Sequence, residues 1–118
     1  MKRITAVVCL ISVIGVSVLS AHAPVNISLS FDGESKILTV EFIHKVRNRS
    51  DHFIDRVRVS LNGEEIVEQR LSLQETKDGG TLIYKLIDAA EGDEIEVLLD
   101  CVKGGKLKKK MTLEKRTG

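Results

Sequence analysis

The sequence predicts an all-β fold, an immunoglobulin-like antiparallel β-sandwich of about seven strands. Two observations lead to this class. Apolar and polar residues alternate with a period of two along nearly the whole chain beyond its N-terminal segment, and no convincing amphipathic helix interrupts them. Turn sequences with glycine or asparagine separate these alternating segments.

The first half of the chain provides four of the expected strands. Residues 25–31 and 38–42 alternate on either side of an Asp-Gly-Glu-Ser turn, and the second strand ends at His44. After a polar stretch, residues 56–61 and 64–73 flank Asn62-Gly63. That dipeptide is a strong hairpin signal, because both residues tolerate the positive φ of a two-residue turn.

The second half provides three more strands. A loop over 74–80 leads to a strand at 82–87, and an Ala-Glu-Gly-Asp turn leads to another at 95–101. A Gly-Gly turn precedes the last strand, at 107–113. We expect its lysines to form a solvated face that protects the edge of a sheet.

The N-terminus has the organisation of a secretory signal peptide. A basic Met-Lys-Arg start precedes an apolar run at 4–19 and small residues at Ser20 and Ala21. Cleavage after Ala21 would give a signal peptide at 1–21, one domain at 22–118 and an exported protein, periplasmic or extracellular. The alternative is a retained membrane anchor, since about 20 apolar residues span a bilayer.

The charges of the chain nearly balance. There are 18 Lys and Arg against 17 Asp and Glu, and loss of Lys2 and Arg3 with the signal peptide would leave 16 basic residues. This balance gives no support for binding to nucleic acid or to a membrane surface. A membrane contact is therefore expected only if the N-terminal segment is retained.

The chemistry of the chain is concentrated in three histidines and one cysteine, His22, His44, His52 and Cys101. Cys9 would leave with the signal peptide, so Cys101 has no internal disulfide partner. It is a metal ligand, a redox thiol, an intermolecular crosslink or an inert buried thiol. Imidazole nitrogens with one thiolate suit zinc, iron or copper.

Convergence of these side chains is plausible from their places in the strands. His44 ends one strand, His52 precedes another, and Cys101 ends a third on its inward phase. Cleavage before His22 would also add an α-amine to its imidazole as a chelating pair. The alternative interpretation is that the histidines are ordinary polar residues and Cys101 a small buried apolar side chain.

The order of these residues resembles the iron domain of superoxide reductases (desulfoferrodoxin). The resemblance rests on His22-Ala-Pro24-Val25, His44, Asp51-His52-Phe53-Ile54 and Cys101 before a glycine-containing turn. It implies an immunoglobulin-like sandwich that binds one non-haem iron through four histidines and one cysteine thiolate. Carried onto this chain, it implies metal ligation by His22, His44, His52 and Cys101.

The chain departs from the family pattern in three further respects, and the first of them removes one metal ligand. Gly104 stands where the family has its last histidine, three positions after the cysteine, and Lys45 stands where the family usually has proline. Ser20-Ala21 replaces the acidic and lysine residues that serve the open iron position in the family. Whether the chain is an enzyme therefore stays open, as does the choice among iron, zinc, copper and no metal.

A second resemblance is to the Z subunit of the Sox thiosulfate-oxidising complex, a sandwich without a metal centre. The longer polar insert before His52, then Asn62-Gly63-Glu64 and Glu91-Gly92-Asp93, carry this resemblance. The sequence therefore predicts an exported, metal-binding, redox-related protein with an unidentified redox or protein partner. The alternative is a non-catalytic interaction or carrier module.

Overall fold

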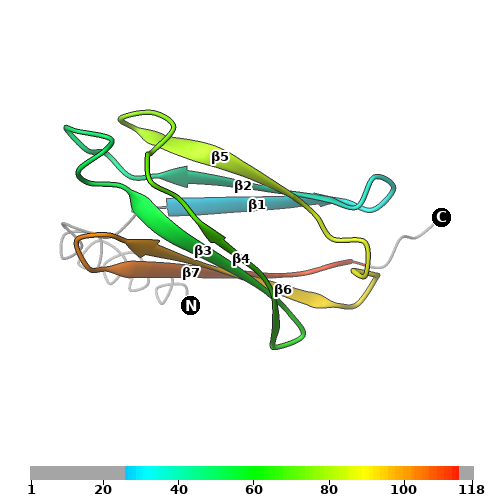
Figure 1. Cartoon of the computed structure of the whole chain (residues 1–118). Helices are drawn as coiled ribbons and strands as arrows, with labels where there is room; N and C mark the ends of the chain where they lie inside the picture. Colours follow the sequence, from blue (N-terminus) through cyan, green and yellow to red (C-terminus); the bar gives the residue numbers. More distant parts are fainter. Residues whose placement is uncertain (1–25, 115–118) are drawn as a thin grey trace, which may run out of the picture.

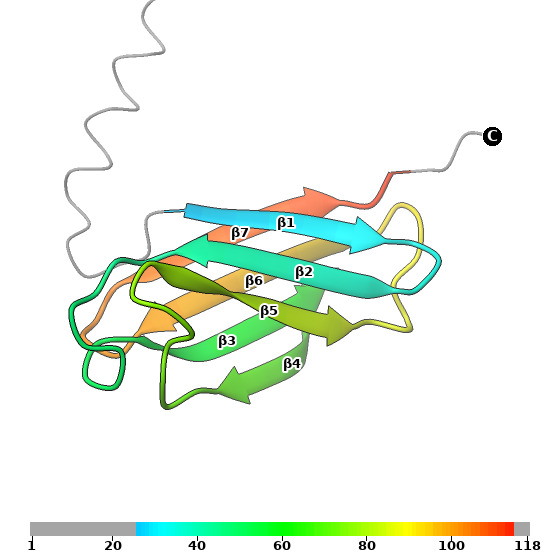
Figure 2. The ribbon, with the colours of Figure 1, turned by 90° about the horizontal axis from the view of Figure 1, so that it is seen from above.

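The computed structural model describes residues 26–114, which form seven antiparallel strands in two sheets. One sheet has the order β1-β2-β5 and the other has the order β4-β3-β6-β7. The two sheets lie one above the other as layers (Figures 1 and 2). The prediction of an all-β sandwich is confirmed. The strands are β1 (Asn26–Asp32), β2 (Ile37–Ile43), β3 (Ile54–Leu61), β4 (Glu64–Arg70), β5 (Gly79–Lys85), β6 (Glu94–Cys101) and β7 (Lys106–Thr112).

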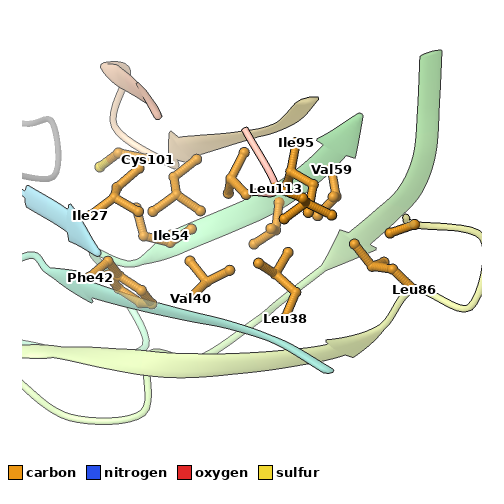
Figure 3. Packing of buried hydrophobic residues seen from close by; sticks show 14 residues of the cluster. Ile27, Leu38, Val40, Phe42, Ile54, Val59, Leu86, Ile95, Cys101 and Leu113 are labelled. Carbon is orange, nitrogen blue, oxygen red and sulfur yellow. The ribbon is translucent and has the colours of Figure 1, made fainter. Parts of the chain in front are cut away.

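The apolar core lies between the two sheets and consists of inward-facing side chains at alternate strand positions. Figure 3 shows Cys101 at one end of this cluster and Leu86 at the other. No helix within residues 26–114 is long and apolar enough to cross a membrane. The buried core residues are Ile27, Leu38, Val40, Phe42, Ile54, Val57, Val59, Leu86, Ala89, Ile95, Val97, Leu99, Cys101 and Leu113.

The hairpin predicted from Asn62-Gly63 joins β3 to β4. The φ angles of these residues are 52° and 86°, and the flanking Leu61 pairs with Glu64. Two consecutive positive φ values match the twist of antiparallel strands, which is why Asn-Gly is favoured here.

A β-bulge at the start of β3 changes which side chains face the core. Ile54 pairs with Cys101 and Arg56 pairs with Asp100, so Asp55 is an extra residue on β3. Strict alternation from Val57 would point Asp55 into the core and Ile54 out of it. Because of the bulge, Ile54 is only 1% exposed and lies opposite Cys101. The chain before β3 is thereby held beside the end of β6.

Strand β5 begins earlier than the sequence pattern indicates, at Gly79 rather than near residue 82. Gly79 pairs with Ile43 and Gly80 pairs with Phe42, at the end of β2. Gly79 has φ 149°, and a Cβ there would lie 2.0 Å from the backbone oxygen of Phe42. Only glycine allows this approach, which brings the loop before β5 against the end of β2.

The last strand, β7, is an edge strand, as expected from its lysines. Lys106, Lys108, Lys109 and Lys110 are all exposed, and Lys108 lies 3.4 Å from Glu96 on the neighbouring β6. Exposed lysines along an edge discourage pairing with another chain.

Candidate metal centre

Three of the four residues singled out in the sequence meet at one end of the sandwich. His44, His52 and Cys101 each offer one ligand atom, and these atoms all lie within 4.8 Å of one another. They come from the end of β2, the loop before β3 and the end of β6. His22 lies outside the described residues.

His44 continues the inward phase of β2 one step beyond the strand. It follows Phe42 by two positions, and its side chain is 2% exposed. Its backbone N–H donates to the carbonyl of Asp78 at 2.8 Å, and that of Val46 donates to Lys77 at 2.8 Å. The pairing of β2 therefore continues past Ile43, which explains why His44 points into the sandwich.

Gln74 fixes the orientation of the His44 ring. Its Nε2 donates to the backbone carbonyls of His44 at 2.7 Å and Thr76 at 2.9 Å. Its Oε1 lies 2.7 Å from Nδ1 of His44. Since an amide oxygen only accepts, Nδ1 carries the hydrogen and Nε2 keeps a lone pair. That buried Nε2 has no hydrogen-bond partner within residues 26–114.

His52 is presented by a compact turn in the polar loop. The backbone N–H groups of Asp51 and His52 donate to the carbonyl of Asn48, at 3.2 and 3.0 Å. The Asn48 side-chain oxygen accepts from the backbone N–H and the hydroxyl of Ser50, at 2.9 and 2.8 Å. Such Asx geometry stabilises a turn locally. This turn places the half-buried His52 ring in contact with the ring of His44.

Cys101 ends β6 on its inward phase, as predicted, and is 5% exposed. Within the described residues it is a free thiol. Burial raises the pKa of Cys101, and a hydrogen bond from the backbone of Lys103 opposes this only in part. The thiol therefore keeps its proton in the metal-free protein, and a metal would have to displace it.

A hollow of about 350 Å³ opens beside His52. It is lined by residues 45–48, 51 and 52 and by Lys103. Lys45, Arg47 and Lys103 bring positive charge to it, and Asp51 lies 3.9 Å from the Lys103 ammonium. The side of the ligand group that faces this hollow is therefore open to solvent and predominantly cationic.

The three side chains fit a transition metal in chemistry and nearly in spacing. Two imidazoles and a thiolate are a ligand set for zinc, iron or copper. Bond lengths of about 2.0–2.3 Å imply neighbouring ligand atoms about 3.5 Å apart. The separation of up to 4.8 Å requires the ring and thiol groups to close in by about 1 Å. Three protein ligands leave at least one coordination position open.

Gly104 occupies the position where the superoxide reductase pattern has its last histidine. It lies in the turn after β6 with φ 95°, and its N–H donates to the carbonyl of Cys101 at 2.9 Å. A side chain with a Cβ is strained at that φ. The local backbone is therefore suited to glycine.

The fold is similar to that of a protein of known structure. The described sandwich is similar to the solved structure of superoxide reductase (1Fe-SOR) from Giardia intestinalis, with a TM-score of 0.56 at 14% sequence identity. The chain has a superoxide reductase-like fold. The similarity covers 78% of this chain and 97% of that chain. No family model and no curated protein matches the sequence. At this identity the superoxide reductase likeness establishes the fold, as the sequence resemblance implied, and no more.

Proposed function

We propose that this protein binds one transition-metal ion, non-haem iron in the first instance, and acts as a redox-related protein. His44 through Nε2, His52 through a ring nitrogen and Cys101 through Sγ are the proposed ligands. The observation that supports this most is the buried Nε2 of His44, which has no hydrogen-bond partner in the described range. An unsatisfied buried polar atom costs about 1–3 kcal/mol, and a metal bond would remove that cost.

His22 is the proposed fourth ligand. The first described residue, Asn26, pairs with Ile43, next to His44, so the chain enters the sandwich at the end that holds the metal group. The four residues from His22 to Asn26 span at most about 14 Å of extended chain, which limits how far His22 can lie from this end.

We propose that residues 1–21 are removed as a signal peptide, that the domain spans 22–118, and that the protein is exported to the periplasm or cell exterior.

The surroundings of the ligand group suit one-electron chemistry with a small anion. A bound iron would supply the redox change, and the fold is shared with a superoxide reductase. The side chains of Lys45, Arg47 and Lys103 line the open side. Their charges would raise the local concentration of a small anion such as superoxide. Zinc and copper remain alternative occupants, because both also accept imidazole and thiolate ligands.

An anaerobic cobalt(II) titration of the purified protein tests the metal function. We expect saturation at one equivalent, with a sulfur-to-cobalt charge-transfer band that Cys101→Ala abolishes. Lys110→Gln, on the exposed face of β7, serves as the matched control and should bind like the wild type. Absence of any cobalt band in the folded wild-type protein would contradict the proposal.

A metal-free interaction module is the second candidate. Ile83 on the end strand β5 is 63% exposed, and Ile87 just beyond it is 71% exposed. Exposed apolar side chains next to an unpaired strand edge are features of partner-binding surfaces. This candidate, which follows the Sox Z resemblance, gains support only if the titration shows no metal binding.

A further inference from the structure

We infer that Gln74 is a positioning residue for the metal centre, which selects the tautomer of His44 that can bind a metal through Nε2. This inference rests on the proposed function. Gln74 is 2% exposed and is one of the few polar side chains in the buried interior. In the sequence it is the first residue of the polar loop at 74–80, where nothing marks it for a role in the site.

The hydrogen bonds of Gln74 leave its amide only one orientation. Reversing the amide would place its oxygen against the carbonyls of His44 and Thr76, which lie 2.7 and 2.9 Å from Nε2. It would also place an NH₂ group at Nδ1 of His44. The arrangement seen instead uses both amide hydrogens and directs Oε1 at the ring.

Selection of the tautomer follows from that orientation. A neutral imidazole carries one N–H hydrogen. A hydrogen-bond acceptor beside one ring nitrogen holds that hydrogen there and leaves the other nitrogen with a free lone pair. The Gln74 oxygen accepts from Nδ1 of His44 at 2.7 Å. Nε2 is therefore left with a free lone pair that could bind a metal shared with His52 and Cys101. Partners of this kind, bound to the far nitrogen of a ligand histidine, orient the ring and raise metal affinity.

The backbone of Gln74 is held independently of its side chain. Arg49 Nη1 donates to the carbonyls of Gln74 and Glu75, at 2.9 and 2.7 Å. Arg49→Ala should therefore loosen the same loop without touching the Gln74 amide. Arg49→Ala is therefore the matched control, because it shows what loosening the loop does when the Gln74 amide is kept.

The first test is the tautomer of His44 in the metal-free protein, measured by ¹⁵N NMR of the imidazoles at pH 8. The wild type and Arg49→Ala should show hydrogen on Nδ1 and none on Nε2. Gln74→Met, which fills similar space and offers only a weak sulfur acceptor, should move hydrogen to Nε2. Gln74→Glu retains an acceptor and should keep hydrogen on Nδ1, but at a cost in stability, because its second oxygen faces the carbonyls of His44 and Thr76.

The second test is zinc affinity, measured by competition with a chromophoric chelator. Gln74→Met should weaken binding about 10–100-fold, whereas Arg49→Ala should remain near the wild type. A folded Gln74→Met variant with unchanged tautomer and unchanged affinity would overturn the inference. If the wild type itself binds no zinc, cobalt or iron, the proposed function fails first, and the role of Gln74 in metal binding fails with it.

Discussion

The imidazole rings of His44 and His52 meet edge to face, with centroids 4.8 Å apart and an interplanar angle of 86°. The two residues flank the polar loop that leads from β2 to β3, so this contact closes the loop against the end of the sandwich. Edge-to-face contact is a favourable arrangement for aromatic rings without a metal. The ligand group is therefore held together in the metal-free protein, and metal binding would need only small ring movements.

Metal binding should stabilise the fold, because the ligands come from three separate segments. At a metal concentration 100 times Kd the gain is about 2.7 kcal/mol. For a domain of this size that corresponds to a rise in Tm of about 10–20 °C. Differential scanning calorimetry with and without zinc should show this rise in the wild type. His44→Ala and His52→Ala should lose it, and a rise that persists in both variants would rule out these ligands.

Gly79→Ala should damage both the fold and the metal site. The new Cβ would lie 2.0 Å from the Phe42 carbonyl oxygen, next to the backbone that presents His44. We expect a loss of about 2–4 kcal/mol in the free energy of unfolding. Gly33→Ala is the control, because a Cβ there meets nothing within 4 Å. Equal stability of the two variants in urea would contradict the tight approach of β5 to β2.

Tyr84 should make the fold sensitive to alkaline pH. Burial raises its pKa from 10.0 to about 12, so the folded protein holds the phenolic proton more tightly than the unfolded chain does. Its contribution to stability is complete below about pH 10 and is lost as the pH rises toward about 12.

Tyr84→Phe tests this pH dependence. It should cost about 1 kcal/mol near pH 8, since the 2.6 Å hydrogen bond from the phenol to Gln69 Oε1 is lost. In exchange, the decline in unfolding free energy between pH 8 and pH 11 should be shallower than in the wild type. Parallel declines in urea denaturation would show that the phenol is not responsible.

Asp100 should stabilise the outer face of the four-stranded sheet. One of its oxygens, Oδ2, accepts from Arg56 Nε and Arg58 Nη2, both at 3.0 Å, and the Asp100 side chain is 10% exposed. Asp100→Asn should lower the free energy of unfolding by about 1.5–3 kcal/mol. Glu96→Gln, which breaks a more exposed pair with Lys108, should cost at most about 1 kcal/mol. Equal costs in urea would argue against a special role for Asp100.

The strands could be predicted from the sequence because a half-buried strand imposes a period of two. The inward positions of His44 and Cys101 follow from the same rule, since each continues the phase of its strand. The bulge at Asp55 could not be predicted from the sequence. Ile54 and Val57 are both buried although they are three positions apart, a spacing that puts two residues of a regular strand on opposite faces. Only the pairing with β6 decides where the extra residue lies.

The rest of the site lies beyond what strand periodicity can predict. His52 is in a polar loop, so its place before a strand and the resemblance to superoxide reductases indicated that it could meet His44, but not how its ring would be directed. Gln74 has no local signal at all, because a glutamine in a polar loop is usually solvated. Its burial depends on the approach of the loop before β5 to the end of β2, which Gly79 permits.

The most direct test of a metal centre is the metal content of the protein, measured by mass spectrometry after purification without an affinity tag. It should be measured beside the Cys101→Ala variant. The account predicts close to one equivalent of iron in the wild type and its loss in the variant. A folded wild-type protein that carries no metal, or a metal content unaffected by Cys101→Ala, would contradict it.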